Sequence, residues 1–361
     1  MIIRSQGRRG ATRAVFITAA LLTAVLAISM PLAGASVAIA SGTVTWVDAA
    51  RASGPVWEPV KVQGVNGVVT EFLWNSRQQV AAAGYVEPGA GQGSLAVVRN
   101  GTAFVLAKAR VDGIIGWSVD ETLLAYIISS KEGRPLLCLY NPVSRTLDFN
   151  DLPQKVTGKA RGGAWDASGR LLIYTDDALF VRQGTGEWEE RPFPAGFAIL
   201  AEPRFTSAFS GGTGTLLLGT ASGRLALWDI ESDKVTRGPQ VAGVRTGGVN
   251  SRGNRVWTIR RGHPWRLDLY DLDWRSLGHR DGLIIPEAVA SVHGWRLYFL
   301  ARTRRQTTLW AWNLADRRQS AVGPTPSVTG PIGLRISDDG SRLFILTGAN
   351  HAILETPVPP E

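Results

Sequence analysis

The chain has 361 residues, of which 44% are hydrophobic and 19% are charged. This length and composition suit one large folded domain or several small ones, and they exclude a disordered chain and a coiled coil. The single cysteine excludes an internal disulfide framework, and four scattered histidines offer little for a metal centre. We therefore expect neither a bound metal nor a cofactor. The net charge of +9 comes mainly from arginine, which supplies 33 of the 39 basic residues.

The first 40 residues have the pattern of an export signal. Met1–Arg13 carries four arginines and no acid, and Ala14–Met30 is an uncharged apolar run that small residues follow. A basic segment, an apolar segment and a small-residue cleavage site, here after Ala35 or Ala40, describe a secretory signal peptide. The alternative is that residues 14–30 stay uncleaved as an N-terminal helix that anchors the chain in the membrane. Both interpretations predict that the chain from residue 41 onward is extracytoplasmic, that is, secreted, periplasmic or at the cell surface.

A unit of about 44 residues recurs along the rest of the chain. The first strand of each copy is expected to end at residues 74, 117, 165, 209, 249, 292 and 336, at intervals of 40 to 48 residues. The strands are short, rich in Val, Ile, Leu, Trp and Tyr, and bounded by Gly, Asp, Asn and Ser. Such a period with four strands per copy is typical of a β-propeller. Residues 41–361 are therefore predicted to be all-β, as seven blades of four antiparallel strands.

The last copy predicts how the ring closes. After Ala352–Leu354 the chain reaches a Pro-rich end before a fourth strand can form. Two strand-like pieces, Thr43–Asp48 and Val56–Val60, precede the first copy. We expect one of them to complete the last blade, because this pairing would remove an exposed sheet edge.

The turns and strand ends resemble those of known propellers. Three turn segments resemble the blade motif of TolB-like propellers: Trp117–Asp120, Trp165–Gly169 and Ile336–Gly340. The third strands end in Tyr140-Asn141, Trp228-Asp229, Tyr270-Asp271 and Trp312-Asn313, which resemble both TolB-like and WD40-like blades. The resemblance covers about residues 42–361, although the Gly-His pair of WD40 repeats is missing. It implies a propeller, a fold that commonly serves as a binding scaffold and in some members carries an enzyme site.

Motifs for catalysis are weak. Gly116–Asp120 begins like a nucleophile elbow but lacks the final Gly. Asp176 and Asp177 could contact a metal or a cationic ligand, although paired acids in a turn are commonly just solvated. Cys138 falls in a third strand and is expected to be buried. No catalytic residue is therefore assigned.

The charge pattern points to one sector of the ring. Residues 245–318 hold 14 arginines, no lysine and six acids. In the fifth and sixth copies, arginines fall in the loop between the second and third strands, and these loops project from one face of a propeller. Guanidinium groups suit carboxylate and phosphate. The candidate binding residues are Arg260, Arg261, His263, Arg302, Arg304 and Arg305.

These observations leave three hypotheses open. The leading one is an exported, monomeric, non-enzymatic binding or scaffold module at the cell envelope, whose partner is an envelope protein or an anionic polymer rather than nucleic acid. The first alternative is a propeller enzyme, such as a lactonase-like or other small hydrolase, with its site in the central channel. The second is an extracytoplasmic sensory domain, which retention of the N-terminal segment as a membrane anchor would favour.

Overall fold

The computed structural model describes residues 55–60, 62–130, 134–156, 160–184, 186–200, 209–210, 214–262, 264–291, 293–303, 306–325, 331–337, 339–347 and 353–359. All of them belong to one compact unit, Pro55–Glu361. The predicted targeting segment 1–40 and the piece Thr43–Asp48 lie outside the described residues, so the boundary at residue 41 stays a prediction. The described residues form strands and turns, which confirms the all-β prediction, and they include no helix that could cross a membrane.

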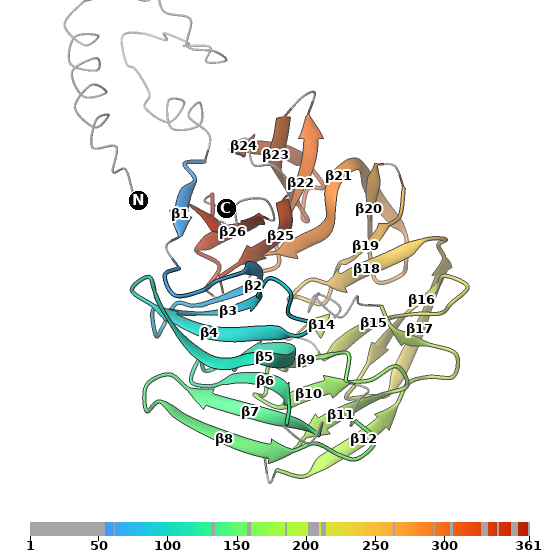
Figure 1. The fold of residues 1–361 in the computed structure, drawn as a ribbon. Helices are drawn as coiled ribbons and strands as arrows, with labels where there is room; N and C mark the ends of the chain where they lie inside the picture. The colour runs from blue at the N-terminus through green and yellow to red at the C-terminus, as the bar shows by residue number, and fades with distance from the viewer. Residues whose placement is uncertain are drawn as a thin grey trace, which may run out of the picture. The chain divides into compact units, whose positions relative to one another are not determined.

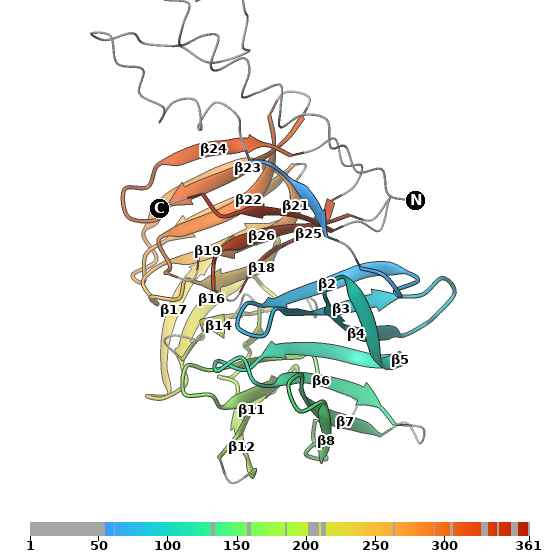
Figure 2. The same cartoon turned by 90° about the vertical axis from the view of Figure 1, so that its left-hand side faces the viewer.

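The first sheet has seven antiparallel strands in chain order (Figures 1 and 2). They are β2 (Val68–Asn75), β3 (Val80–Val86), β4 (Gly93–Arg99), β5 (Thr102–Trp117), β6 (Leu124–Ser129), β7 (Pro135–Asn141) and β8 (Thr146–Asp151). The 16-residue β5 pairs with β4 along its first part and with β6 along its second, and Val111 pairs with both neighbours. One strand is thus the last of one four-strand group and the first of the next.

Two smaller sheets follow. One consists of β9 (Gly162–Trp165), β10 (Leu171–Tyr174), β11 (Ala178–Arg182) and β12 (Trp188–Pro192). The other consists of β13 (Ala198–Ile199), β14 (Phe209–Ser210), β15 (Thr215–Gly219), β16 (Arg224–Asp229) and β17 (Lys234–Gln240). In the second of these sheets β13 and β14 are both short and both pair with β15.

The second seven-stranded sheet repeats the design of the first. Its strands are β18 (Val244–Val249), β19 (Val256–Arg260), β20 (Trp265–Tyr270), β21 (Ser276–Ala290), β22 (Arg296–Thr303), β23 (Gln306–Asn313) and β24 (Gln319–Pro324). The 15-residue β21 pairs with β20 and then with β22. The register shifts between Leu283 and Ala288, where β21 passes from one four-strand group to the next.

The last sheet joins the two ends of the compact unit. It contains β25 (Pro331–Ile336), β26 (Arg342–Thr347), β27 (Ile353–Pro357) and β1 (Glu58–Val60). β1 pairs antiparallel with β27, with Glu58 opposite Glu355 and Val60 opposite Ile353. The prediction that an N-terminal piece completes the last set of strands is therefore confirmed for Val56–Val60.

The middle strands of each group are buried on both faces. Val80–Tyr85, Leu171–Tyr174 and Leu343–Leu346 are buried along their whole length, and their sequences are unbroken apolar runs rather than alternating ones. The outer strands β8, β12 and β17 carry charged side chains instead, such as Asp148 and Lys234. Charge on an outer strand discourages edge-to-edge association.

Buried clusters join each pair of middle strands to the next along the chain. They link β3–β4 to β6–β7, then β6–β7 to β10–β11, β10–β11 to β15–β16, β15–β16 to β18–β20, β19–β20 to β22–β23, and β22–β23 to β25–β26. A further cluster sets Phe72 and Ala83 of the first sheet against Phe344 and Leu346 of the last, and the rings of Phe72 and Phe344 are 5.1 Å apart. The first and last sheets are therefore neighbours.

Candidate functional site

The turns that resemble TolB-like blades have a structural role. In two of them the second residue is a serine whose hydroxyl donates to an Asp two positions on, at 2.5 Å for both Ser118–Asp120 and Ser337–Asp339. The same hydroxyl accepts a backbone N–H at the start of the next strand, at 2.9 Å from Leu123, just before β6, and from Arg342, the first residue of β26. Side chains of Ser and Asp stabilise turns by such local bonds. Ser118 therefore has a structural role in this turn.

These aspartates predict a loss of stability in acid. Hydrogen bonds from Ser118 lower the pKa of Asp120, and for Asp339 the bonds from Ser337 and Ser341 lower the pKa although burial acts in the opposite direction. A lowered folded-state pKa contributes stability that is present above the ordinary value of 3.8 and is lost as the pH falls through the folded-state pKa. Thermal unfolding should therefore show a falling midpoint below about pH 3.8, and Asp120→Asn with Asp339→Asn should flatten this fall. An equally steep fall in the double variant would contradict this assignment.

The strand ends shared with WD40-like blades are also turn formers. The carboxamide or carboxylate oxygen of Asn141, Asp229, Asp271 and Asn313 accepts backbone N–H groups two to four residues later. A residue with positive φ then closes each turn, and the aromatic residue before the Asp or Asn packs inward. Trp228 and Trp312 are 1% exposed, and Trp312 Nε1 donates to the carbonyl of Arg317, which has a φ of 64°.

The structure sets the two predicted arginine loops side by side. Arg260 and Arg261 lie where β19 connects to β20, and Arg302 lies near the end of β22 before β23. Leu283 of β21 pairs with Trp265 on one side and with Ala301 on the other. Neighbouring strands are about 4.8 Å apart, so the two hairpin ends are separated by roughly 10 Å. His263, Arg304 and Arg305 lie outside the described residues.

A buried acid orders part of this surface. Asp268 is 5% exposed, its Oδ2 lies 3.0 Å from Arg260 Nε, and its Oδ1 accepts a hydrogen bond of 2.8 Å from Arg266. The single carboxylate of Asp268 thus pairs with the guanidinium groups of Arg260 and Arg266, and the three groups together keep a net charge of +1. Arg261 and Arg302 are exposed, and among the described residues neither side chain has a hydrogen-bond or ion-pair partner. We call Arg260, Arg261, Arg266 and Arg302 the Arg-rich face.

An aromatic stack lies on the same sheet. The guanidinium of Arg280 is 3.8 Å from the centre of the Trp310 ring, and burial lowers the pKa of Arg280. Cation–π contacts of this kind keep the charge while fixing the side chain. The acid next to Arg280 in sequence is the exposed Asp281, whose Oδ2 is 3.6 Å from His279 Nε2.

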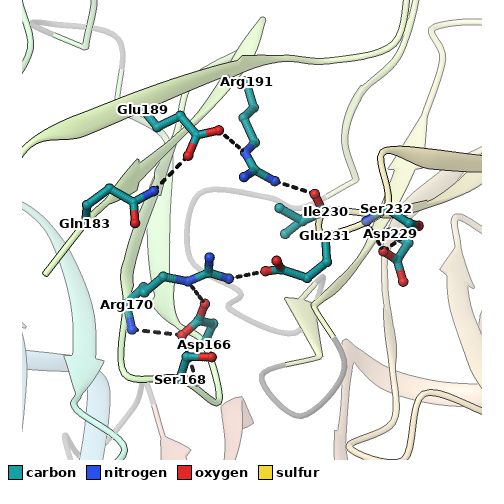
Figure 3. Close-up of polar contacts among 10 residues, drawn as sticks. All are labelled: Asp166, Ser168, Arg170, Gln183, Glu189, Arg191, Asp229, Ile230, Glu231 and Ser232. Carbon is teal, nitrogen blue, oxygen red and sulfur yellow. Dashed lines mark hydrogen bonds and ion pairs between the residues drawn. The ribbon is translucent and has the colours of Figure 1, made fainter.

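The charge network in Figure 3 joins two neighbouring sheets. Arg170 donates to Asp166 Oδ2 at 2.5 Å and pairs with Glu231 of the turn after β16. Arg191 of β12 reaches the backbone carbonyl of Ile230 in the same turn. Arg170 and Arg191 are already paired with drawn carboxylates, and Asp229 accepts hydrogen bonds from Ser232. We therefore interpret the network as a contact between sheets and not as a ligand site.

A second charge cluster, which the sequence analysis missed, joins the first strands of three groups. Arg335 of β25 forms a two-bond pair with Glu71 of β2, and its Nη1 donates to Glu287 Oε1 of β21 at 2.8 Å. Glu287 Oε2 also accepts the N–H of Leu334 at 2.6 Å. Burial raises the pKa of Glu287, while the pKa of Arg335 is raised by the two carboxylates although burial opposes this. We call Glu71, Glu287 and Arg335 the buried triad.

The remaining candidate residues, Cys138, Asp176 and Asp177, are either buried or paired with nearby side chains. Cys138 is fully buried as predicted, and burial raises the pKa of its thiol to about 11. Asp176 pairs with Arg161 at 2.7 Å, and Asp177 accepts from Thr175 at 2.6 Å. Within the described part of the chain, no group of three or more His, Cys, Asp and Glu side chains is close enough to hold a metal ion.

No protein-family model matches the chain, and no curated protein matches it. Solved structures do match. The WD40 repeats of RRP9 align with a TM-score of 0.62 at 14% identity, over 85% of this chain and 99% of theirs. U3-55K aligns with a TM-score of 0.58 at 12% identity, over 84% and 98%. The β-propeller domain of Cps50 (Swd1) from Myceliophteria thermophila aligns with a TM-score of 0.55 at 13% identity, over 84% and 100%.

At these identities the likeness concerns the fold alone. The matching structures are WD40 propellers, so the resemblance to TolB-like blades stays a prediction. Together with the strand order and the contact between first and last sheets, the matches show that the chain has a WD40-like β-propeller fold.

Proposed function

We propose that this chain is an exported β-propeller that acts as a non-enzymatic binding module at the cell envelope, where its Arg-rich face contacts an anionic partner. The observation that carries the proposal is the pairing of Leu283 with both Trp265 and Ala301, since it brings the two arginine-bearing hairpins together. The partner is an acidic envelope protein or an anionic polymer. WD40-type propellers are typically scaffolds for protein binding, which agrees with a role of this kind.

The strand pairing supports a ring of seven blades. Both long strands, β5 and β21, divide between two four-strand groups, and each of the remaining three sheets supplies one group. The buried clusters between successive groups return to the first group through Phe344 and Phe72. A closed ring would leave the outer strands as the only edges, and three of these, β8, β12 and β17, carry charged residues.

Export rests on the sequence. Met1–Arg13 is basic, Ala14–Met30 is apolar, and cleavage at Ala35 or Ala40 would release the propeller into an extracytoplasmic compartment. A fusion of residues 1–54 to a reporter that is active only outside the cytoplasm should be active. A reporter signal no higher than that of a fusion lacking residues 1–54 would contradict export.

The Arg-rich face is organised before any partner binds. Asp268 holds Arg260 and Arg266 in place, so these side chains lose little rotational freedom on binding. Arg261 and Arg302 are exposed, and no described residue pairs with their guanidinium groups. Guanidinium groups form paired hydrogen bonds to carboxylate or phosphate. The buried triad does not support the alternative of an enzyme site, because both of its carboxylates, Glu71 and Glu287, are already paired with Arg335.

A capture experiment with a charge-reversed control tests the proposal. The immobilised protein should retain an envelope component at low salt and release it at high salt, because contacts between exposed charges are screened. Arg261→Glu with Arg302→Glu should retain at least about tenfold less, while changing the free energy of unfolding by less than about 0.5 kcal/mol per residue. Equal retention by both proteins would reject the Arg-rich face. Retention of nothing at either salt would favour the channel enzyme, which thermal-shift screening of small ligands and cations would then pursue.

A further inference from the structure

The arginines of the second seven-stranded sheet divide between its two ends. In the Arg-rich face, Arg260 and Arg261 lie at the end of β19 and Arg302 lies near the end of β22. Arg266 lies near the start of β20, opposite Arg260. Five other arginines lie in or next to turns at the opposite end of the sheet. Arg296 begins β22 and Arg302 lies near its end, six residues away, so the two surfaces are about 20 Å apart. We call the described residues 250–255, 291, 293–296 and 313–318 the basic turn cluster; its arginines are Arg252, Arg255, Arg296, Arg317 and Arg318.

Hydrogen bonds hold the three turns together. Asn250 Nδ2 donates to the carbonyl of Gly294 at 2.9 Å. The N–H of Leu314 donates to the carbonyl of Trp295 at 2.7 Å, and Arg255 Nε donates to the carbonyl of Leu314 at 3.2 Å. Gly294 has a φ of 71°, and a Cβ there would lie 2.7 Å from Ser251 Oγ, so the close approach requires glycine. The cluster is therefore a single fixed surface.

This surface is strongly positive. Its five arginines face a single acid among the described residues of the three turns, Asp316, which gives a net charge of +4. Asp316 lies 3.9 Å from Arg318, whose side chain is 87% exposed, so this pair is long and solvated. The described structure gives Arg252 and Arg317 no carboxylate partner. An anionic partner would meet unpaired guanidinium groups here.

An arginine–tryptophan stack lies at the centre of the cluster. The guanidinium of Arg252 is 3.7 Å from the centre of the Trp295 ring, and its Nε donates to the carbonyl of His293 at 2.7 Å. Stacking and this bond fix the guanidinium plane, and no described residue bonds to its terminal nitrogens, which can therefore form a forked pair with a carboxylate. Trp295 is nevertheless 39% exposed, which is unusual for so large an apolar side chain. Trp and Arg are the residue types that dominate the binding energy of protein–protein interfaces.

We propose that the basic turn cluster is a second docking surface, independent of the Arg-rich face, and that it takes an acidic segment of a partner protein. The net charge of +4 selects a run of Asp or Glu side chains, and Arg252 binds one of their carboxylates as a fork. The exposed part of Trp295 accepts an apolar side chain next to that run. An anionic polymer without apolar groups would leave the exposed part of the Trp295 ring in water. The combination of positive charge and an exposed aromatic ring therefore favours a peptide.

The test uses the full chain and a fluorescein-labelled glutamate-rich peptide that carries one leucine, with binding followed by fluorescence anisotropy. Arg252→Glu and Trp295→Ala should each weaken binding by about tenfold or more, the effect of losing a central interface contact. Arg318→Glu should weaken it as well, and the exposure of this side chain makes a folding defect unexpected. Removing the leucine from the peptide should weaken binding to the unaltered protein but not to Trp295→Ala.

Matched controls separate this proposal from the function proposed above. Arg261→Glu with Arg302→Glu should leave peptide affinity within about twofold, because this site is a strand length away. An equal loss in that control would show non-specific attraction to total charge and overturn the proposal. A polyphosphate chain that binds as tightly as the peptide, together with no effect of Trp295→Ala, would also overturn it. Unchanged affinity in Arg252→Glu and Arg318→Glu would do the same.

Discussion

Arg335→Leu is expected to lower the free energy of unfolding by about 3–5 kcal/mol, because it leaves two buried carboxylates without their shared partner. Glu71 and Glu287 have side chains that are 18% and 5% exposed, so water replaces the guanidinium poorly. The triad also connects β2, β21 and β25. Loss of the Arg335 side chain should therefore reduce the cooperativity with which the first and last sheets unfold. Urea unfolding of both proteins at neutral pH measures the difference.

Glu287→Gln is the control for this change and carries a pH dependence of its own. Burial raises the pKa of Glu287 above 4.5, so this carboxyl contributes stability that is complete below pH 4.5 and is lost as the pH rises through its folded-state pKa. The glutamine keeps an oxygen for the N–H of Leu334 and leaves Arg335 paired with Glu71. Glu287→Gln should therefore lower the free energy of unfolding far less than Arg335→Leu does. It should also remove the loss of stability that accompanies the rise in pH. Similar losses in the two variants would contradict this account of the buried triad.

Trp312→Ala is expected to lower the free energy of unfolding by about 3–5 kcal/mol, as for other large side chains removed from a core. Trp312 is 1% exposed, packs with Trp257 and Phe299, and donates its Nε1 to the carbonyl of Arg317 at 3.1 Å. The change would leave a cavity between two strand groups and remove a turn contact. Chemical denaturation of the purified protein measures the loss.

Trp295→Ala provides the comparison. Trp295 is 39% exposed and stacks on Arg252 at the surface, so its removal should lower the free energy of unfolding by less than about 1 kcal/mol. A difference of several kcal/mol between the two variants would therefore reflect burial and not residue type. Equal losses would mean that the surface stack supports the fold as much as the core does.

The repeat could be predicted because each strand has a local sequence signature. Leu171–Tyr174 and Leu343–Leu346 are apolar runs of strand length, and Ser, Asp or Asn begins the turn beside them. The continuity of β5 and β21 could not be predicted, because it depends on one strand pairing with two neighbours in turn. Val111 carries this exchange in β5, and nothing in its local sequence distinguishes it from an ordinary strand residue.

The adjacency of the two arginine-bearing hairpins was predictable, but the pairing of their side chains was not. Consecutive repeats brought Arg260 and Arg302 to adjacent hairpins, as the repeat order predicts. That Asp268 would hold Arg260 and Arg266 depends on which side chains share a face of β20, and this needs the register. The buried triad joins residues up to 264 positions apart. Its one local signal is a charged residue inside an otherwise apolar first strand, as at Glu71 and Arg335.

The salt dependence of the dissociation constant for the captured envelope partner tests the central claim most directly. For the unaltered full chain, the constant should rise steeply with salt concentration, because exposed guanidinium groups at Arg261 and Arg302 make the contact. Arg261→Glu with Arg302→Glu should give weaker binding with a clearly shallower salt dependence, and its thermal unfolding should match that of the unaltered protein. The same constant and the same slope in both proteins would place the partner elsewhere on the molecule and contradict an Arg-rich binding face.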